Sequence, residues 1–231
     1  MYLPSEKFGK IKKALIVLPL PEWHYFKEEL SAKKVYRWLS INFALLKEEV
    51  FLIGPIFSAP QVGLLMEYLI SKGLKSVLAV GWAGKSPFSD LELGDLFLPV
   101  KALSLEGTSK FYFKGRKIFK INPDLLEKLT FLLPKYSLSF KEGFILTVDA
   151  PFVVEKKLKE FSFYLKRASA MDMETSILYA LSEYYKIQVG ALHFITDKIG
   201  SNSRVRPEKK LKVVRKALIP FLKNYLENVE L

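Results

Sequence analysis

The sequence predicts an α/β fold of one domain, in which a mixed central β-sheet is flanked by helices. Short apolar runs typical of buried strands alternate with amphipathic stretches of helical period along all 231 residues. No linker, repeat or change of composition divides the chain, so residues 1–231 are expected to form a single domain. Half of the residues are hydrophobic and 26% are charged, which is the balance of a globular protein.

The first half of the chain is predicted to contain a parallel crossover. Residues 59–71 carry apolar side chains on one face at helical spacing, with Ser58 expected as the N-terminal cap and Gly73 as the end of the helix. The strands before and after this helix are therefore expected to lie parallel. Four strands are predicted in this half, at residues 13–18, 38–46, 49–53 and 75–80, the last of them ending at Gly81.

The second half of the chain alternates in the same way. Strands are predicted at residues 95–104, 144–148 and 189–196, with a hairpin at 111–119 around Gly115. Helices are predicted at residues 123–133, 151–161, 174–185 and 207–228. Helices between strands indicate a sheet that is covered on both faces.

The composition excludes several classes of protein. The chain has no cysteine, which excludes disulfides, thiolate zinc sites and cysteine nucleophiles and favours a reducing, cytoplasmic setting. No apolar run approaches the ~20 residues that cross a bilayer, and no cleavage site follows the first one, so we expect neither a membrane segment nor a signal peptide. The two histidines lie far apart, so no metal or organic cofactor is expected, and His193, in an apolar strand, is expected to be a core residue.

The net charge of +12 is the difference between 36 basic and 24 acidic residues. The lysines are spread along the whole chain, and the densest basic segment, residues 204–216, alternates with apolar residues at helical spacing. This pattern indicates a solvated helix face, so nucleic acid is an unfavoured partner. A protein associated with nucleic acid would show an affinity that falls steeply with salt.

Polar residues and glycines follow several of the predicted strands. Ligands of α/β sheets bind at the carboxyl ends of strands, where loops and helix N-termini converge. Each of these residues also has an ordinary explanation as a turn or a cap. The segments are residues 54–55, 81–84, 149–152 and 196–198, and residues 170–174, which enter a helix.

Taken in order, these segments resemble the nucleoside phosphorylase and nucleosidase superfamily. Five motifs carry the resemblance, which extends from about Ala14 to the terminal helix. They are residues 172–175 (DMET), similar to the ribose-binding (D/E)ME motif; 93–99 (LGDLFLP), similar to VGDIVIP; 105–109 (LEGTS), similar to DGTS; 147–152 (TVDAPF), similar to SSDxFY; and 195–198 (ITDK), similar to (S/T)D. The resemblance implies a three-layer α/β sandwich, cleavage of the N-glycosidic bond of a nucleoside, and assembly as a homo-oligomer.

The resemblance also implies roles for four residues. Breaking an N-glycosidic bond builds positive charge on the ribose and negative charge on the leaving base. Asp197 is accordingly expected to act as the acid at the base, and Glu174 to accept hydrogen bonds from two ribose hydroxyls. Met173 is expected to lie against the sugar and Phe152 against the base. The aspartate at position 197 favours a purine over a pyrimidine.

The acceptor side of the expected site departs from the phosphorylase pattern. Phosphorylases of this family hold phosphate with a glycine-rich first turn, an arginine, and a serine or threonine just past a glycine. Here the acceptor region comprises Gly54, Gly81 and Trp82, with Trp82 at the serine or threonine position. A phosphate dianion needs positive charge and exposed backbone amides. The pattern therefore favours hydrolysis, with Glu22 as the candidate base for water, while phosphate stays a possible co-substrate.

Two alternatives stay open at this point. Arg204, Arg206 or His24 could rebuild an anion site and restore the use of phosphate. Alternatively, a non-catalytic descendant of the family would keep Glu174 and Asp197 and bind a nucleoside or nucleotide without turnover.

Overall fold

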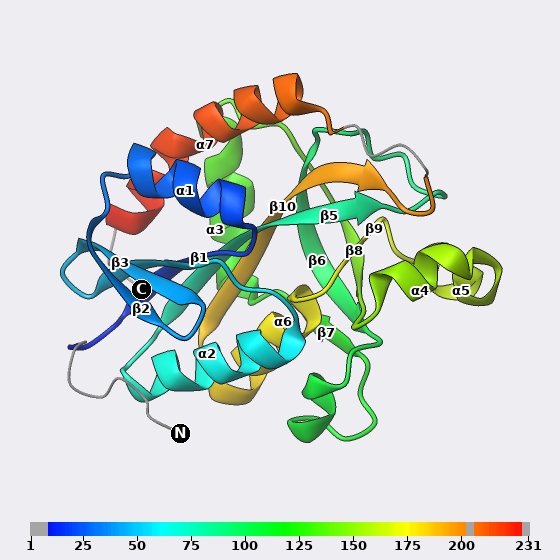
Figure 1. Ribbon diagram of the computed structural model, residues 1–231, viewed down its shortest axis with the longest axis horizontal. Helices are drawn as coiled ribbons and strands as arrows, with labels where there is room; N and C mark the ends of the chain where they lie inside the picture. Colours follow the sequence, from blue (N-terminus) through cyan, green and yellow to red (C-terminus); the bar gives the residue numbers. More distant parts are fainter. Residues whose placement is uncertain (1–8, 202–205, 228–231) are drawn as a thin grey trace.

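A ten-stranded mixed sheet runs through the computed structural model, which describes residues 9–201 and 206–227 (Figure 1). The strands lie in the order β10-β6-β8-β9-β5-β1-β4-β3-β2, and β7 pairs with β6. Their bounds are β1 Lys13–Val17, β2 Lys33–Trp38, β3 Ile41–Lys47, β4 Val50–Gly54, β5 Ser76–Lys85, β6 Leu96–Ser104, β7 Ile118–Lys120, β8 Phe140–Thr147, β9 Ala170–Asp172 and β10 Gln188–Lys198.

Helices cover both faces of the sheet, so the expected α/β arrangement is confirmed. In Figure 1, α1 and α7 lie on one side of the sheet, and α2 and α6 pack together on the other. None of the described helices is both long and apolar enough to cross a membrane. The helices are α1 Leu20–Glu29, α2 Ala59–Ser71, α3 Pro123–Lys135, α4 Pro151–Lys156, α5 Leu158–Leu165, α6 Thr175–Tyr185 and α7 Glu208–Glu227, with a 3₁₀ turn, η1, at Thr108–Phe111.

Strand β1 lies in the middle of the sheet and is buried along its whole length. It pairs in parallel with β4 on one side and β5 on the other. The helix α2 connects these two neighbours, which confirms the predicted parallel crossover. A strand that is covered on both faces favours a continuous apolar run over alternation, which is why this segment is easy to recognise in the sequence.

Part of the sheet closes on itself. Strand β10 pairs in parallel with β5 and antiparallel with β6, while β6, β8, β9 and β5 pair in succession. Five strands therefore form a closed ring, to which β1, β4, β3 and β2 are attached as an open extension. The closure brings the carboxyl ends of β5, β9 and β10 together.

Several predicted elements differ from the structure. Most of the predicted strand 38–46 is β3, but its first residue ends β2 and the next two form the hairpin turn, where Leu39 has φ of +53°. Strand β5 does not end at Gly81 but continues to Lys85, because β10 extends beside it and supplies hydrogen bonds. The predicted hairpin 111–119 is the turn η1 and the strand β7, which pairs with β6 instead. The predicted helix 151–161 is divided into α4 and α5.

The predicted terminal helix is present as α7, although Asn228 lies outside the described residues. Its last turn is anchored to the centre of the sheet. The buried Lys13 donates through Nζ to the carbonyl of Tyr225 at 3.0 Å, and the Tyr225 hydroxyl lies 2.8 Å from Ser76 Oγ. Burial, together with neighbouring lysines, lowers the pKa of Lys13 to about 8. The terminal helix is therefore fixed against β1 and β5.

Candidate active site

A cavity of about 230 Å³ opens at the carboxyl ends of β1, β5 and β10. Four of the residues expected in the site line it, namely Trp82, Met173, Glu174 and Asp197. The other lining residues are Leu18, Pro19, Ile56, Phe57, Ala83, Gly84, Pro151, Glu155, Met171, Asp172, Thr196 and Arg206. The topological prediction that ligands bind at strand ends therefore places the cavity correctly.

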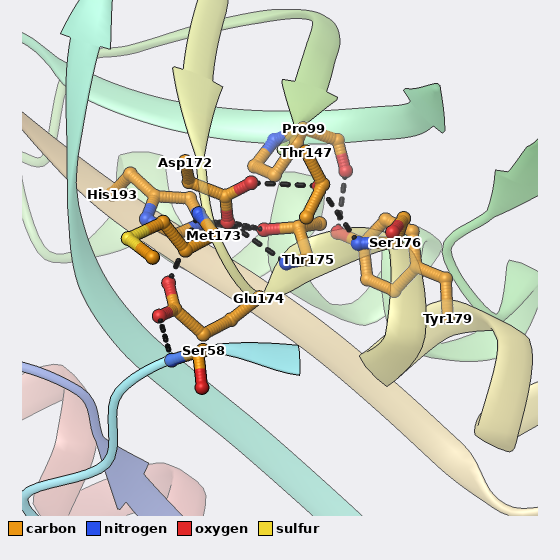
Figure 2. A network of polar contacts seen from close by, with 10 residues as sticks. All are labelled: Ser58, Pro99, Thr147, Asp172, Met173, Glu174, Thr175, Ser176, Tyr179 and His193. Atoms are coloured by element: carbon orange, nitrogen blue, oxygen red, sulfur yellow. Dashed lines mark hydrogen bonds and ion pairs between the residues drawn. The ribbon is translucent and has the colours of Figure 1, made fainter. Parts of the chain in front are cut away.

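Glu174 occupies the N-cap position of α6, but its side chain does not cap the helix. Its carboxylate accepts hydrogen bonds from the backbone N–H of Ser58 at 2.7 Å and of Met173 at 3.2 Å (Figure 2). Burial and the nearby charge of Asp172 raise the pKa of Glu174 to about 8. Two carboxylate oxygens offer about four acceptor positions, so this side chain retains capacity for further donors.

Ser58 is the N-cap residue of α2, as predicted, but its side chain does not cap the helix. Its φ is +76°, and its hydroxyl makes no capping hydrogen bond. The unusual backbone conformation instead turns the Ser58 N–H toward Glu174. One end of the α2 crossover is thereby used to hold the carboxylate of the site.

Asp172 fixes the junction between β9 and α6. Its side chain accepts hydrogen bonds from Thr147 Oγ1 at 2.7 Å, from the Thr175 N–H at 2.8 Å and from the Thr175 hydroxyl (Figure 2). Thr147 Oγ1 in turn accepts from the Ser176 N–H at 3.0 Å. Because this buried carboxylate is held from both sides, it positions the two following residues, Met173 and Glu174, at the cavity.

His193 lies in the core beneath this junction, as expected from the sequence. It is fully buried, and its Nε2 lies 2.8 Å from Thr175 Oγ1 and 3.7 Å from the Asp172 carboxylate. Burial lowers the pKa of His193, although the charge of Asp172 opposes the shift. The ring is therefore a neutral structural partner at neutral pH.

Asp197 lies near the end of β10, and its side chain is partly buried. The Thr196 hydroxyl donates to Asp197 Oδ1 at 2.6 Å, which fixes the orientation of the carboxyl group. Gly84 pairs with Asp197 across the two strands, and a Cβ at Gly84 would lie 3.1 Å from Asp197 Oδ2. Because Gly84 has no side chain, it leaves room for the carboxyl group of Asp197.

Trp82 connects the cavity to Glu22. Its indole Nε1 donates to Glu22 Oε1 at 2.7 Å, and the guanidinium of Arg206 lies 4.0 Å from the centre of its ring. Glu22 itself is fully buried in the first turn of α1 and does not line the cavity. Arg215 of α7 pairs with the same Glu22 oxygen at 2.8 Å.

The two glycines of the expected acceptor region serve packing and do not line the cavity. An added Cβ at Gly54 would lie 2.2 Å from the carbonyl oxygen of Val17, and one at Gly81 would lie 2.8 Å from the ring of His193. Both glycines are needed because neighbouring groups approach the backbone closely. Trp82 is therefore the part of the expected acceptor region that reaches the cavity.

Phe152 lies outside the cavity and is 73% exposed. The same helix, α4, instead places Pro151 and Glu155 along the lining. Three residues were predicted as candidates to rebuild an anion site. Arg206 lines the cavity, His24 is exposed on α1, and Arg204 lies outside the described residues.

Sequence reasoning missed two contacts of the site. One is the Ser58 N–H on Glu174, and the other is Arg215 on Glu22, whose partners are 193 residues apart. Neither contact has a spacing signal in the sequence. In the part of the chain that the structure describes, no three His, Asp or Glu side chains are grouped so that they could hold a metal ion.

The chain is similar to known proteins over most of its length. The family model described as "Phosphorylase superfamily" matches residues 7–227. A 5′-methylthioadenosine/S-adenosylhomocysteine nucleosidase of Buchnera aphidicola is 23% identical over 214 residues, which cover 89% of each protein.

Solved structures share the fold. The AMP nucleosidase from Bacteroides thetaiotaomicron has a TM-score of 0.74 and 23% identity, with 94% of this chain and 90% of that chain covered. The Campylobacter jejuni 5′-methylthioadenosine/S-adenosylhomocysteine nucleosidase has a TM-score of 0.75 and 20% identity, with 93% and 97% covered. The futalosine hydrolase of Helicobacter pylori has a TM-score of 0.75 and 18% identity, with 92% and 96% covered.

Proposed function

Because this chain belongs to the phosphorylase superfamily, we propose that it cleaves the N-glycosidic bond of a purine nucleoside or a related compound by hydrolysis. The observation that carries the proposal is that one cavity brings together Glu174, Asp197 and Trp82, although they come from three separate segments of the chain. The similar proteins named above are nucleosidases or hydrolases, which agrees with water as the acceptor.

The sugar binds at the junction of β9 and α6. Glu174 accepts hydrogen bonds from two ribose hydroxyls, using the acceptor positions that the Ser58 and Met173 N–H groups leave. Met173 lies against the apolar side of the sugar. These contacts anchor the ring while positive charge develops on it.

The base binds toward the end of β10, where Asp197 acts as the acid. When the bond between the C1′ carbon and the base nitrogen breaks, its electron pair moves to the base. Asp197 donates a proton to a nitrogen of the purine ring and so neutralises the developing charge. An uncharged base is a better leaving group.

The acceptor is water because the cavity offers phosphate a poor site. A phosphorylase needs a cradle of backbone amides and cationic groups, whereas Trp82 fills this wall and is hydrogen-bonded to an acid, Glu22. Arg206 is the one cationic side chain among the described lining residues. The oxygen of water bonds to C1′ while its proton passes to Glu22, which yields the free sugar.

The test is release of free base from inosine, adenosine, guanosine, methylthioadenosine, AMP and uridine, each with and without inorganic phosphate. We expect phosphate-independent release from purine substrates and little from uridine. Glu174→Gln and Asp197→Asn should each lower kcat/KM by roughly 100-fold or more. Trp82→Phe, which keeps the ring and removes the N–H donor, should leave the reaction independent of phosphate.

Two outcomes would replace this proposal. Strict dependence on phosphate would assign an anion site to Arg206 and make the protein a phosphorylase. Binding of nucleosides without turnover of any substrate would make it a non-catalytic descendant of the family.

We further propose that the protein acts as a homo-oligomer in the cytoplasm, without a metal or organic cofactor. Phe57, which lines the cavity, and Phe152, which follows the lining residue Pro151, are 58% and 73% exposed, which supports a subunit interface near the cavity. Light scattering at micromolar protein concentration tests the assembly, and a monomer would contradict it. Unchanged activity after treatment with a chelator tests the absence of a metal requirement.

A further inference from the structure

Arg215 lies on the terminal helix α7 and pairs with the candidate base, Glu22. Its Nε and Nη2 donate to Glu22 Oε1 at 2.9 and 2.8 Å. Trp82 Nε1 donates to the same oxygen at 2.7 Å. Three donors from two distant elements thus converge on Oε1, which fixes the carboxylate.

The second oxygen of Glu22 is the one that Arg215 and Trp82 leave unused. Glu22 Oε2 is buried and has no hydrogen-bond partner among the described residues. A buried carboxylate oxygen is normally satisfied by a donor, because water that it loses on burial must be replaced. A water molecule at Oε2 would satisfy it. Glu22 does not line the cavity itself, but its hydrogen bond to Trp82, which does, connects the carboxylate to the cavity wall.

We propose that Arg215 is a positioning residue for the hydrolytic step. By holding Oε1 together with Trp82, it presents Oε2 of Glu22 as the oxygen that takes a proton from the attacking water. In this step the water oxygen bonds to C1′, the C1′–N bond breaks with its electron pair on the base, and Asp197 supplies the proton that the base gains. The inference rests on the hydrolysis proposed above.

The anchoring of Arg215 suits this role. Its side chain is only 14% exposed, and its Nη1 donates to Glu208 Oε2 at 3.3 Å on the outer side. Near the end of α7, the carbonyl of Tyr225 accepts a hydrogen bond from Lys13. Arg215 is therefore presented by a fixed helix, and its reach to Glu22 depends on that docking.

The experiment is a double-mutant cycle measured as phosphate-independent base release. The variants are Arg215→Met, Glu22→Gln and the combination of both. Arg215→Lys is the conservative rescue, and Glu208→Gln is the matched control, because it removes the other partner of Arg215 and leaves Glu22 untouched. Thermal unfolding of each variant shows whether the fold is retained.

We expect Arg215→Met to lower kcat by about 10- to 100-fold with KM changed by less than about twofold. Arg215→Lys should recover part of the loss, and Glu208→Gln should behave as the wild type. Because Arg215 acts through Glu22, the double variant should be no slower than Glu22→Gln alone.

The inference is overturned if Arg215→Met changes kcat by less than about twofold, or if its effect multiplies with that of Glu22→Gln in the double variant. If Arg215→Met and Arg215→Lys share a folding defect and Arg215→Lys recovers no activity, the role of Arg215 is purely structural. Failure of the proposed function is distinguishable from all of these, since the wild type itself would then release no base without phosphate.

Discussion

A nucleoside should bind about 50-fold more weakly at pH 6 than at pH 8, because ribose hydroxyls donate to Glu174 and require its ionised form. With a pKa of about 8, Glu174 is ionised in about 1% of molecules at pH 6 and in about half at pH 8. The apparent affinity follows this ionised fraction. Above pH 8 the affinity can increase by only about twofold more, so it should reach a plateau.

The direction of this effect follows from proton linkage. Burial and Asp172 raise the pKa of Glu174 in the free protein, whereas two hydroxyl donors stabilise the charged form in the complex and lower it again. Binding therefore releases a proton between the two pKa values, and affinity must increase with pH in that range.

The assay is titration calorimetry with a C-nucleoside, whose carbon–carbon glycosidic bond resists cleavage. Measurements in the Asp197→Asn background separate the contribution of Glu174 from that of the acid at the base. Calorimetry in buffers of different ionisation enthalpy counts the released protons directly. Glu174→Gln should abolish both the pH dependence below pH 8 and the proton release.

The reasoning is refuted if the Asp197→Asn protein binds the C-nucleoside equally well at pH 6 and pH 8. It is also refuted if Glu174→Gln keeps the pH dependence. In either case Glu174 would not be the group that ionises to hold the ribose.

Three further outcomes concern stability and are measured by urea unfolding. The pKa of Glu174 is raised from 4.5 to about 8 on folding, so its stabilising contribution is complete below pH 4.5 and is lost as pH rises through 8. Glu174→Gln should therefore be more stable than the wild type above pH 8, by a few kcal/mol at most. The difference in the free energy of unfolding should be smaller at pH 5. Gly81→Ala should destabilise by about 1–3 kcal/mol, because its Cβ would lie 2.8 Å from the His193 ring; a neutral result would mean that the ring moves freely. Thr175→Val should cost about 1–3 kcal/mol by removing a hydroxyl donor from the buried Asp172, and an unchanged midpoint would contradict the role given to that network.

Local patterns determined much of the fold in advance. The helix at 59–71 and the strand at 13–18 follow from apolar periodicity, which acts within a single element. Motifs at strand ends also located Glu174 and Asp197, because the carboxyl ends of strands collect the loops of an α/β sheet. Capping contacts and strand ends were less reliable. Ser58 is the N-cap of α2 but its side chain makes no capping hydrogen bond, and β5 continues past Gly81, because distant partners decide both features.

The residue types and order of the site were thus determined by the sequence itself, including the tryptophan at 82 and the acid at 22. Only the tertiary structure decided how they are held. The burial that raises the pKa of Glu174 and the pairing of Arg215 with Glu22 depend on the packing of α2 and α7 against the sheet. No spacing along the chain encodes a contact between residues 22 and 215, because it exists only once the terminal helix docks beside the first.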